Sequence, residues 1–193
     1  MKRDEAAARL EFLEAAGALK DVMRSGFTIA GRPEDTAAHT WRLCLWVLVF
    51  EDQLAGVDIL RLLKICLLHD LGEAISGDIP APLQHTDKSA EERADLMTLL
   101  APLPANVREN LAALWDDYAN AGSPEARLAK GLDKLETILQ HTQGKNPPGF
   151  DHGFNLDYGR DRTDAHPLLR TLRDFVDDKT RACIGTTNPD SQQ

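Results

Sequence analysis

His69 and Asp70 stand side by side at the end of a strongly apolar segment, and they are the first residues of the chain with an obvious chemical use. The segment before them, Ile59–Leu68, is apolar except for two basic residues, which predicts a helix buried on most sides. Glu73 and Asp78 follow soon after. Burying a histidine and three acids is costly without compensation. A divalent metal ion supplies that compensation, because imidazole and carboxylate both bind first-row metals.

Two more residues, on other predicted helices, could complete a metal site. His39 lies one turn into a predicted helix over residues 34–55, and Asp133 lies in the amphipathic segment RLAKGLDKLETILQ. Helical bundles build metal sites from side chains on facing helices. The sequence therefore predicts one divalent-metal site with four protein ligands: His39, His69, Asp70 and Asp133.

The composition of this ligand set indicates the kind of ion and the kind of chemistry. Imidazole and carboxylate ligands together suit Mn, Co, Fe or a similar ion better than a structural zinc, which prefers sulfur. Four protein ligands on an octahedral ion leave room for a water and a substrate oxygen, which is what metal-assisted hydrolysis requires.

The elements that position these residues are all predicted to be helices. Hydrophobic periodicity, caps and Gly/Pro breaks predict helices over residues 5–23, 34–55, 59–75, 88–100, 104–120, 123–142 and 167–181. Residues 23–33 and 144–163 are predicted to be loops, and no segment alternates as a strand would. The predicted fold is all-α: a single compact bundle of about six or seven helices over residues 1–183, followed by a disordered tail at 184–193.

Composition narrows the functions that this chain could perform. Its 193 residues, with 42% hydrophobic and 27% charged, fit one globular domain. No apolar run could span a bilayer, and the N-terminus lacks a secretory apolar region, so we expect a cytoplasmic location and no membrane partner. A net charge of −9 argues against a nucleic-acid polymer as partner. Three scattered cysteines support neither a zinc finger nor a disulfide framework.

Four blocks of sequence stand in a characteristic order. They are Arg24–Phe27, Pro33–His39, His69–Ile79 and Leu132–Gln140. In spacing and flanking residues they resemble the small 5′-deoxynucleotidase family of the HD-domain phosphohydrolase superfamily, over about residues 10–142. The resemblance implies a compact helical fold, often dimeric, so a homodimer is one possibility. It also implies that the substrate is a small nucleotide, and that the reaction removes phosphate from deoxynucleoside 5′-monophosphates.

The resemblance also implies roles for single residues. It carries metal ligation onto the four residues given above, phosphate binding onto Arg24, an acid/base role onto Glu73 and a substrate contact onto Asp78. The family often has a tryptophan near this arginine. Here Phe27 or Ser25 occupies that neighbourhood, and Phe27 is assigned to substrate binding.

The remaining histidines and the long loop receive separate predictions. His85, His141, His152 and His166 lack a partner motif, so we expect them to lie outside the site. The loop at 144–163 has no counterpart in the resemblance. Because long structureless loops in compact domains are often binding loops, we predict that it borders the site and touches the nucleoside.

Other functions fit the sequence less well. Guanosine tetraphosphate hydrolases of the superfamily typically have an aspartate directly after the glutamate of HDxxE, where this chain has Ala74. Nucleoside triphosphohydrolases and dinuclear phosphodiesterases carry further histidines, which are absent after His69–Asp70. A non-catalytic nucleotide-binding module would be expected to have lost a ligand, and none of the four is lost.

Overall fold

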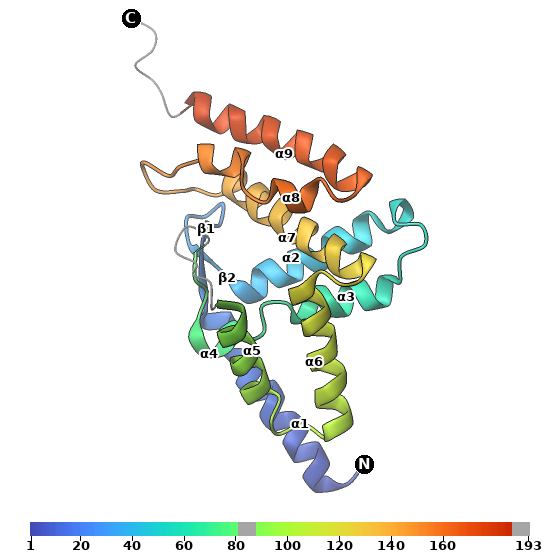
Figure 1. Ribbon diagram of the computed structural model, residues 1–193. Coiled ribbons are helices and arrows are strands. Elements are labelled where there is room, and N and C mark those ends of the chain that lie inside the picture. The colour runs from blue at the N-terminus through green and yellow to red at the C-terminus, as the bar shows by residue number, and fades with distance from the viewer. Residues whose placement is uncertain (81–87, 187–193) are drawn as a thin grey trace, which may run out of the picture.

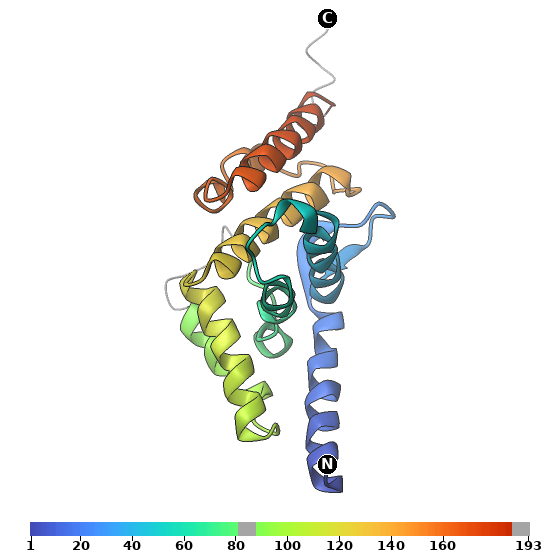
Figure 2. The same ribbon diagram turned by 90° about the vertical axis from the view of Figure 1, so that its right-hand side faces the viewer.

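Helix α7 (Pro124–Gln143) runs through the middle of the molecule, and the other helices of the upper half pack on it (Figures 1 and 2). It begins where the sequence predicts, since the Ser123 hydroxyl accepts a hydrogen bond from Ala126 N and Pro124 takes the first helical position. Helix α9 (Pro167–Thr186) lies along α7 on the side away from α1 (Arg3–Ala16) (Figure 2).

The structure, a computed structural model, describes residues 1–80 and 88–186. Besides α1, α7 and α9, the longer helices are α2 (Thr36–Val49), α3 (Ile59–Leu68), α5 (Lys88–Leu99) and α6 (Ala105–Asn120). The short elements are α4 (Glu73–Ser76), α8 (Arg160–Thr163), the 3-10 turns η1 (Gly17–Asp21), η2 (Glu51–Gln53) and η4 (Gly153–Leu156), and the strands β1 (Met23–Phe27) and β2 (Pro33–Asp35). Seven helices of ten residues or more in the described ranges confirm the all-α prediction. None of the helices in those ranges is both long and apolar enough to cross a membrane.

Residues 23–33, predicted to be a loop, instead form a small antiparallel hairpin of β1 and β2. Met23 pairs with Asp35 and Phe27 with Pro33, with an irregularity between them. The strands are too short to show an alternating pattern, and tertiary contact stabilises them. A Cβ on Gly26 would lie 3.1 Å from Gln140 Cγ, so the glycine allows β1 to pack closely on α7.

The segment after α3 turns sooner than predicted. Helix α3 starts at its predicted cap, with Asp58 accepting from Arg61 N, but it ends at Leu68 and not at the glycine beyond α4. A tight turn follows, in which the His69 carbonyl accepts from Trp115 Nε1 at 3.0 Å. A Cβ on Gly72 would lie 2.6 Å from the Glu92 carbonyl oxygen. Glycine at position 72 therefore allows α5 to approach closely. The turn places His69 and Asp70 at the end of a buried helix.

Two apolar clusters hold these elements, and the turn after α3 lies between them. The first joins α2, α3, α7 and α9, and the second joins η1, α5 and α6 to Leu68 and Leu71. Each fully buried leucine or isoleucine side chain contributes roughly 1.5–3 kcal/mol. The residues between Leu68 and Leu71 are thus anchored from both sides.

The C-terminal part differs from prediction in two places. Helix α9 continues to Thr186, so the first residues of the predicted tail are helical, and residues 187–193 lie outside the described part of the chain. The predicted loop at 144–163 contains the single turns η4 and α8.

Arg173, on α9, fastens the segment 155–158 to this helix. Its side chain is 2% exposed. The guanidinium donates to Asp177 Oδ1 at 2.6 Å and to the carbonyl oxygens of Asn155, Leu156 and Tyr158, each at 2.7 Å. A cation buried among this many acceptors rigidifies the segment that it holds.

We predict that Arg173→Met lowers the free energy of unfolding by about 3–5 kcal/mol, because it leaves three carbonyl groups and the buried Asp177 without this donor. Urea denaturation would measure the change. Arg181→Met is the matched control, since Arg181 lies on the same helix and pairs with Asp178 at the surface. The control should change stability by about 0.5 kcal/mol or less, and equal effects of the two substitutions would contradict the assignment.

Candidate metal and phosphate site

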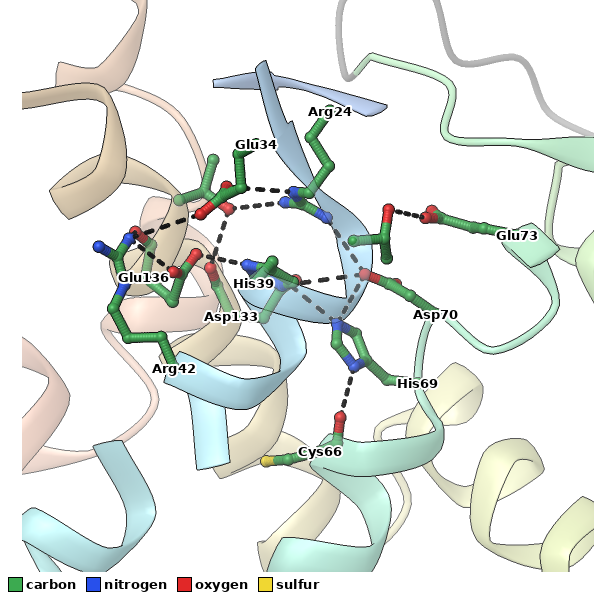
Figure 3. Close-up of polar contacts among 12 residues, drawn as sticks. Arg24, Glu34, His39, Arg42, Cys66, His69, Asp70, Glu73, Asp133 and Glu136 are labelled. Atoms are coloured by element: carbon green, nitrogen blue, oxygen red, sulfur yellow. Dashed lines mark hydrogen bonds and ion pairs between the residues drawn. The ribbon is translucent and has the colours of Figure 1, made fainter. Parts of the chain in front are cut away.

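The four predicted ligands converge on one point, although they come from three separate parts of the chain: α2, the turn after α3, and α7 (Figure 3). His39 Nε2 lies 3.2 Å from Asp133 Oδ1 and 3.8 Å from Asp70 Oδ2. His69 Nε2 lies 2.9 Å from Asp70 Oδ2 and 3.9 Å from Asp133 Oδ1. The side chains of both histidines are fully buried.

The hydrogen bonds of the two histidines fix which ring nitrogen faces the centre. His39 Nδ1 bonds the Glu136 carboxylate, and His69 Nδ1 donates to the Cys66 carbonyl oxygen at 2.7 Å. With Nδ1 protonated on each ring, Nε2 carries a lone pair. Among the described residues neither buried Nε2 has a hydrogen-bond partner. Two unpartnered imidazole nitrogens facing two carboxylate oxygens fit a divalent cation, and acceptors behind the rings are typical of such sites.

Both aspartates have partners as well, Asp133 through the oxygen that faces away from the histidines and Asp70 through the oxygen that faces them. Asp133 Oδ2 accepts from the Tyr118 hydroxyl at 3.2 Å and lies 2.9 Å from Lys134 Nζ, which leaves Oδ1 toward the histidines. Asp70 Oδ2 accepts from Arg24 Nη1 at 3.2 Å. Each candidate ligand therefore has a partner that orients it.

The charges around the centre favour a cation. Burial raises the pKa of Asp70, but His69 and Arg24 more than offset this and hold it below its ordinary value. The pKa of Asp133 is likewise well below its ordinary value, because Lys134, His39 and His69 outweigh burial. Both carboxylates are ionised at neutral pH. Burial and Arg24 lower the pKa of His39, yet Glu136 and Asp133 raise it to about 9 overall, which shows how strongly this environment attracts positive charge.

An ionic network behind His39 was not predicted. Glu136 is fully buried, and its carboxylate accepts from Arg42 Nε at 2.7 Å as well as bonding His39. Glu34, from β2, lies 4.0 Å from Arg42 and 3.8 Å from Arg24. Burial and Glu136 raise the pKa of Glu34 to about 7, against the opposing effect of His39 and the two arginines. The signal for Glu136 was present in the sequence, since it lies three residues after Asp133 and so near the same helix face.

Arg24 points from β1 toward the centre and is fixed by α7. Its Nη2 donates to Thr137 Oγ1 at 3.1 Å, and its Nη1 donates to Asp70. Burial lowers the pKa of Arg24, but Asp70, Asp133 and Glu136 raise it above its ordinary value, so the guanidinium stays charged. Arg24 therefore meets the candidate centre as a fixed cation.

Glu73 lies one turn beyond the centre at the start of α4. It is 2% exposed, accepts from Thr36 Oγ1 at 3.3 Å and lies 4.0 Å from Lys88 Nζ. Burial, Asp70 and Asp78 raise the pKa of Glu73 to about 9, with Arg24 and Lys88 opposing. A cation at the candidate centre would act in the same direction as these two basic groups.

A cavity of about 700 Å³ opens over the centre. Its described lining includes Asp70, Asp133, Arg24, Glu73 and Asp78, together with these residues of the predicted loop: Phe150, Asp151, Phe154 and Tyr158. The prediction that this segment borders the site is therefore confirmed.

The structure differs from two of the predictions made for single residues, Phe27 and His141. Within the described lining, β1 contributes Arg24 and Ser25 but not Phe27, whose carbonyl oxygen instead accepts from Gln140 Nε2. His141, expected to lie outside the site, lines the cavity. The sequence signal for His141 was its place eight residues after Asp133, two turns along the same face of α7. His85 lies outside the described residues.

Comparison with known proteins places this arrangement in a family. A profile of the HD domain matches residues 16–173. The chain belongs to the HD domain family. The pair His69–Asp70 lies within the match, as do His39 and Asp133. The family assignment confirms the resemblance that the four sequence blocks indicated.

This HD domain chain is similar to several proteins whose names state a function. It is 35% identical over 136 residues to the 5′-deoxynucleotidase HDDC2 of Danio rerio, covering 68% of this chain and 66% of that protein. It is 29% identical over 191 residues to the protein of the same name from Xenopus laevis, covering 95% of this chain and 92% of that protein. A solved structure from Magnetospirillum magnetotacticum, described as a predicted metal-dependent phosphohydrolase, matches 92% of this chain and 94% of that chain, with a TM-score of 0.79 and 26% identity.

We predict that Glu136→Gln weakens the binding of a divalent metal ion to this HD domain about 10–100-fold, because the carboxylate that orients His39 is lost. Competition with a chromophoric chelator would measure the dissociation constant. Glu125→Gln is the matched control, since Glu125 is a buried acid on the same helix that accepts from Asp58 N, away from the centre. Wild-type affinity in the Glu136 variant, or equal weakening in the control, would show that Glu136 does not act through His39.

Proposed function

We propose that this chain is a metal-dependent 5′-deoxynucleotidase, which hydrolyses deoxynucleoside 5′-monophosphates to deoxynucleoside and phosphate. The observation that carries the proposal is the pair of unpartnered histidine nitrogens facing Asp70 and Asp133, beside Arg24. His69 and both aspartates line a cavity of about 700 Å³. The names of the relatives support the substrate class.

The four converging side chains would hold one divalent ion, such as Mn, Co or Fe: His39, His69, Asp70 and Asp133. Such an ion polarises a phosphate oxygen and lowers the pKa of a bound water. The protein's own part is to point Nε2 of both imidazoles at the centre and to keep both carboxylates ionised.

Arg24 is proposed to bind the phosphate group. Its planar guanidinium can make two parallel hydrogen bonds to phosphate oxygens. Thr137, Asp70 and Glu34 hold it in place before the substrate arrives, so little side-chain freedom is lost on binding. The charge that develops on the phosphoryl oxygens during the reaction would be stabilised by this fixed cation.

Glu73 is proposed to deliver the proton that the leaving group needs. Water adds to phosphorus and the bond from phosphorus to the 5′-oxygen breaks. That oxygen takes a proton from Glu73, and one proton of the water returns to Glu73, which leaves deoxynucleoside and hydrogen phosphate. Burial, Asp70 and Asp78 raise the pKa of Glu73, which favours the protonated carboxyl that can donate, while a cation at the four ligands would favour the carboxylate that can accept. Its neighbours Thr36 and Lys88 hold the group at the wall of the cavity.

Asp78 is proposed to contact the sugar. It lines the cavity just beyond the break at Gly77, where the backbone has a positive φ of 84° that favours glycine. A carboxylate at this place can accept a hydrogen bond from a sugar hydroxyl.

The proposal predicts release of inorganic phosphate from deoxynucleoside 5′-monophosphates when a divalent metal is added, and faster release than from the matching ribonucleotides. A panel of mono- and triphosphates assayed with Mn, Co, Fe and Mg would measure this. Asp133→Ala serves as the control and should lose both the metal and the activity. Phosphate release from none of the monophosphates, or hydrolysis of triphosphates alone, would overturn the proposal.

We predict that Glu73→Gln retains the metal and the fold but lowers kcat about 10²–10⁴-fold, because general acid catalysis is lost. Steady-state kinetics, with metal content measured on the same samples, would test this. Glu92→Gln is the matched control, since Glu92 also lines the cavity and also pairs with Lys88. Near wild-type turnover in a metal-loaded Glu73 variant would assign the proton to solvent.

A further inference from the structure

One wall of the cavity extends along the face of α7 that carries Asp133 and Thr137. Asp133, Thr137 and His141 follow one another at steps of four residues, so they lie on one side of the helix. Strand β1 runs beside them, with Arg24 bonded to Thr137 and a Cβ on Gly26 3.5 Å from His141 Cδ2. His141 is thus one helical turn beyond the residue that fixes the proposed phosphate ligand.

The ring of His141 is held in one orientation. Its Nδ1 donates to Asn155 Oδ1 at 2.9 Å, and Asn155 is fully buried. The lone pair then lies on Nε2, and the side chain lines the cavity. Burial lowers the pKa of His141, which agrees with a neutral imidazole that presents an acceptor.

Aromatic side chains surround this acceptor. The ring of Phe150 stands edge-on to His141, with centroids 4.9 Å apart, and contacts His152 at 5.0 Å on its other side. Phe154 stacks on Tyr158 with centroids 5.2 Å apart. Phe150, Phe154 and Tyr158 all line the cavity, so this wall offers apolar faces beside one hydrogen-bond acceptor, as small-molecule sites commonly do.

The wall is preorganised by the buried cation on α9. Arg173 binds the carbonyl oxygens of Asn155 and Tyr158, which fixes the segment that orients His141. A wall fixed before binding costs less ordering when a ligand arrives.

We propose that His141, oriented by Asn155 and Phe150, binds the nucleoside part of the substrate, with Nε2 accepting a hydrogen bond from an O–H or N–H group. The inference rests on the proposed function. Thr137, which holds Arg24, lies one turn of α7 from His141, about 5–6 Å between Cβ atoms, and a nucleoside attached to a phosphate on Arg24 would extend into the cavity. The sugar and the base both carry such donors.

The test separates nucleoside binding from phosphate binding. Isothermal titration calorimetry of deoxynucleosides, which lack phosphate, reports the first, and the inhibition constant of inorganic phosphate reports the second. His141→Ala should raise the dissociation constant of deoxynucleosides about 3- to 30-fold and raise KM for deoxynucleotides in parallel. The inhibition constant of phosphate should stay within about twofold, because Arg24 and Thr137 are unchanged.

Two further variants make the result specific. His141→Gln keeps an acceptor near the position of Nε2 and should restore part of the binding. His152→Ala is the matched control, since His152 is also buried against Phe150 but is absent from the described lining of the cavity. It should leave the dissociation constant unchanged. KM for 2-deoxyribose 5-phosphate, which has no base, rises in the Ala variant only when the donor belongs to the sugar.

The outcomes separate this inference from the proposed function. Equal binding of deoxynucleosides by wild type and His141→Ala overturns the inference while phosphate release by wild type upholds the function. Equal losses of nucleoside and phosphate binding in the Ala variant also overturn it, because they show a structural role. A wild-type protein that binds no deoxynucleoside and releases no phosphate refutes both.

Discussion

The rest of the structure depends on how ionised side chains are compensated inside an apolar core. Buried charges are costly unless they are paired and hydrogen-bonded, and here two carboxylates meet two imidazoles between two leucine-rich clusters. Each ligand is backed by a group of opposite or complementary character, such as Glu136 behind His39 and Lys134 behind Asp133. This backing fixes the direction of every ligand atom, but it leaves the histidine nitrogens at the centre unpartnered. The core is therefore built for a cation.

Helix α7 connects these charged groups to the apolar core of the domain. It carries Asp133 and Glu136 toward the other ligands, Thr137 toward β1, and its apolar residues into the main core. The helix must then be covered on the opposite side, and α9 provides the cover. Arg173 on α9 binds the backbone of the segment 150–158, and side chains of this segment line the cavity and complete its wall. One helix thus links the stability of the domain to the geometry of the site.

The sequence predicted the long helices and the four converging side chains because both leave local signals. Each of these signals occupies only a short stretch of sequence. Examples are the apolar periodicity, the caps at Asp58 and Ser123, and the adjacent pair His69–Asp70. The hairpin could not be predicted, since its strands are short and depend on close packing of Gly26 against α7. The helical position of His141 placed it on the same face as Asp133, but the orientation of its ring could not be predicted, because its hydrogen-bond partner Asn155 lies in a segment with no periodic pattern.

The charges of the cavity explain why the cation and an anionic substrate would depend on one another. Of the described residues that line it, six are acidic and four are basic, within a chain of net charge −9. Arg24 alone cannot outweigh these acids, so a phosphate dianion would meet net repulsion from the walls. A divalent ion among the four ligands would cancel the excess, and a protonated Glu73 would reduce it further. Each would then favour the binding of the other, a reciprocal coupling that linkage requires. An acidic protein can in this way bind an anion, provided that its negative charges are gathered where a cation would sit.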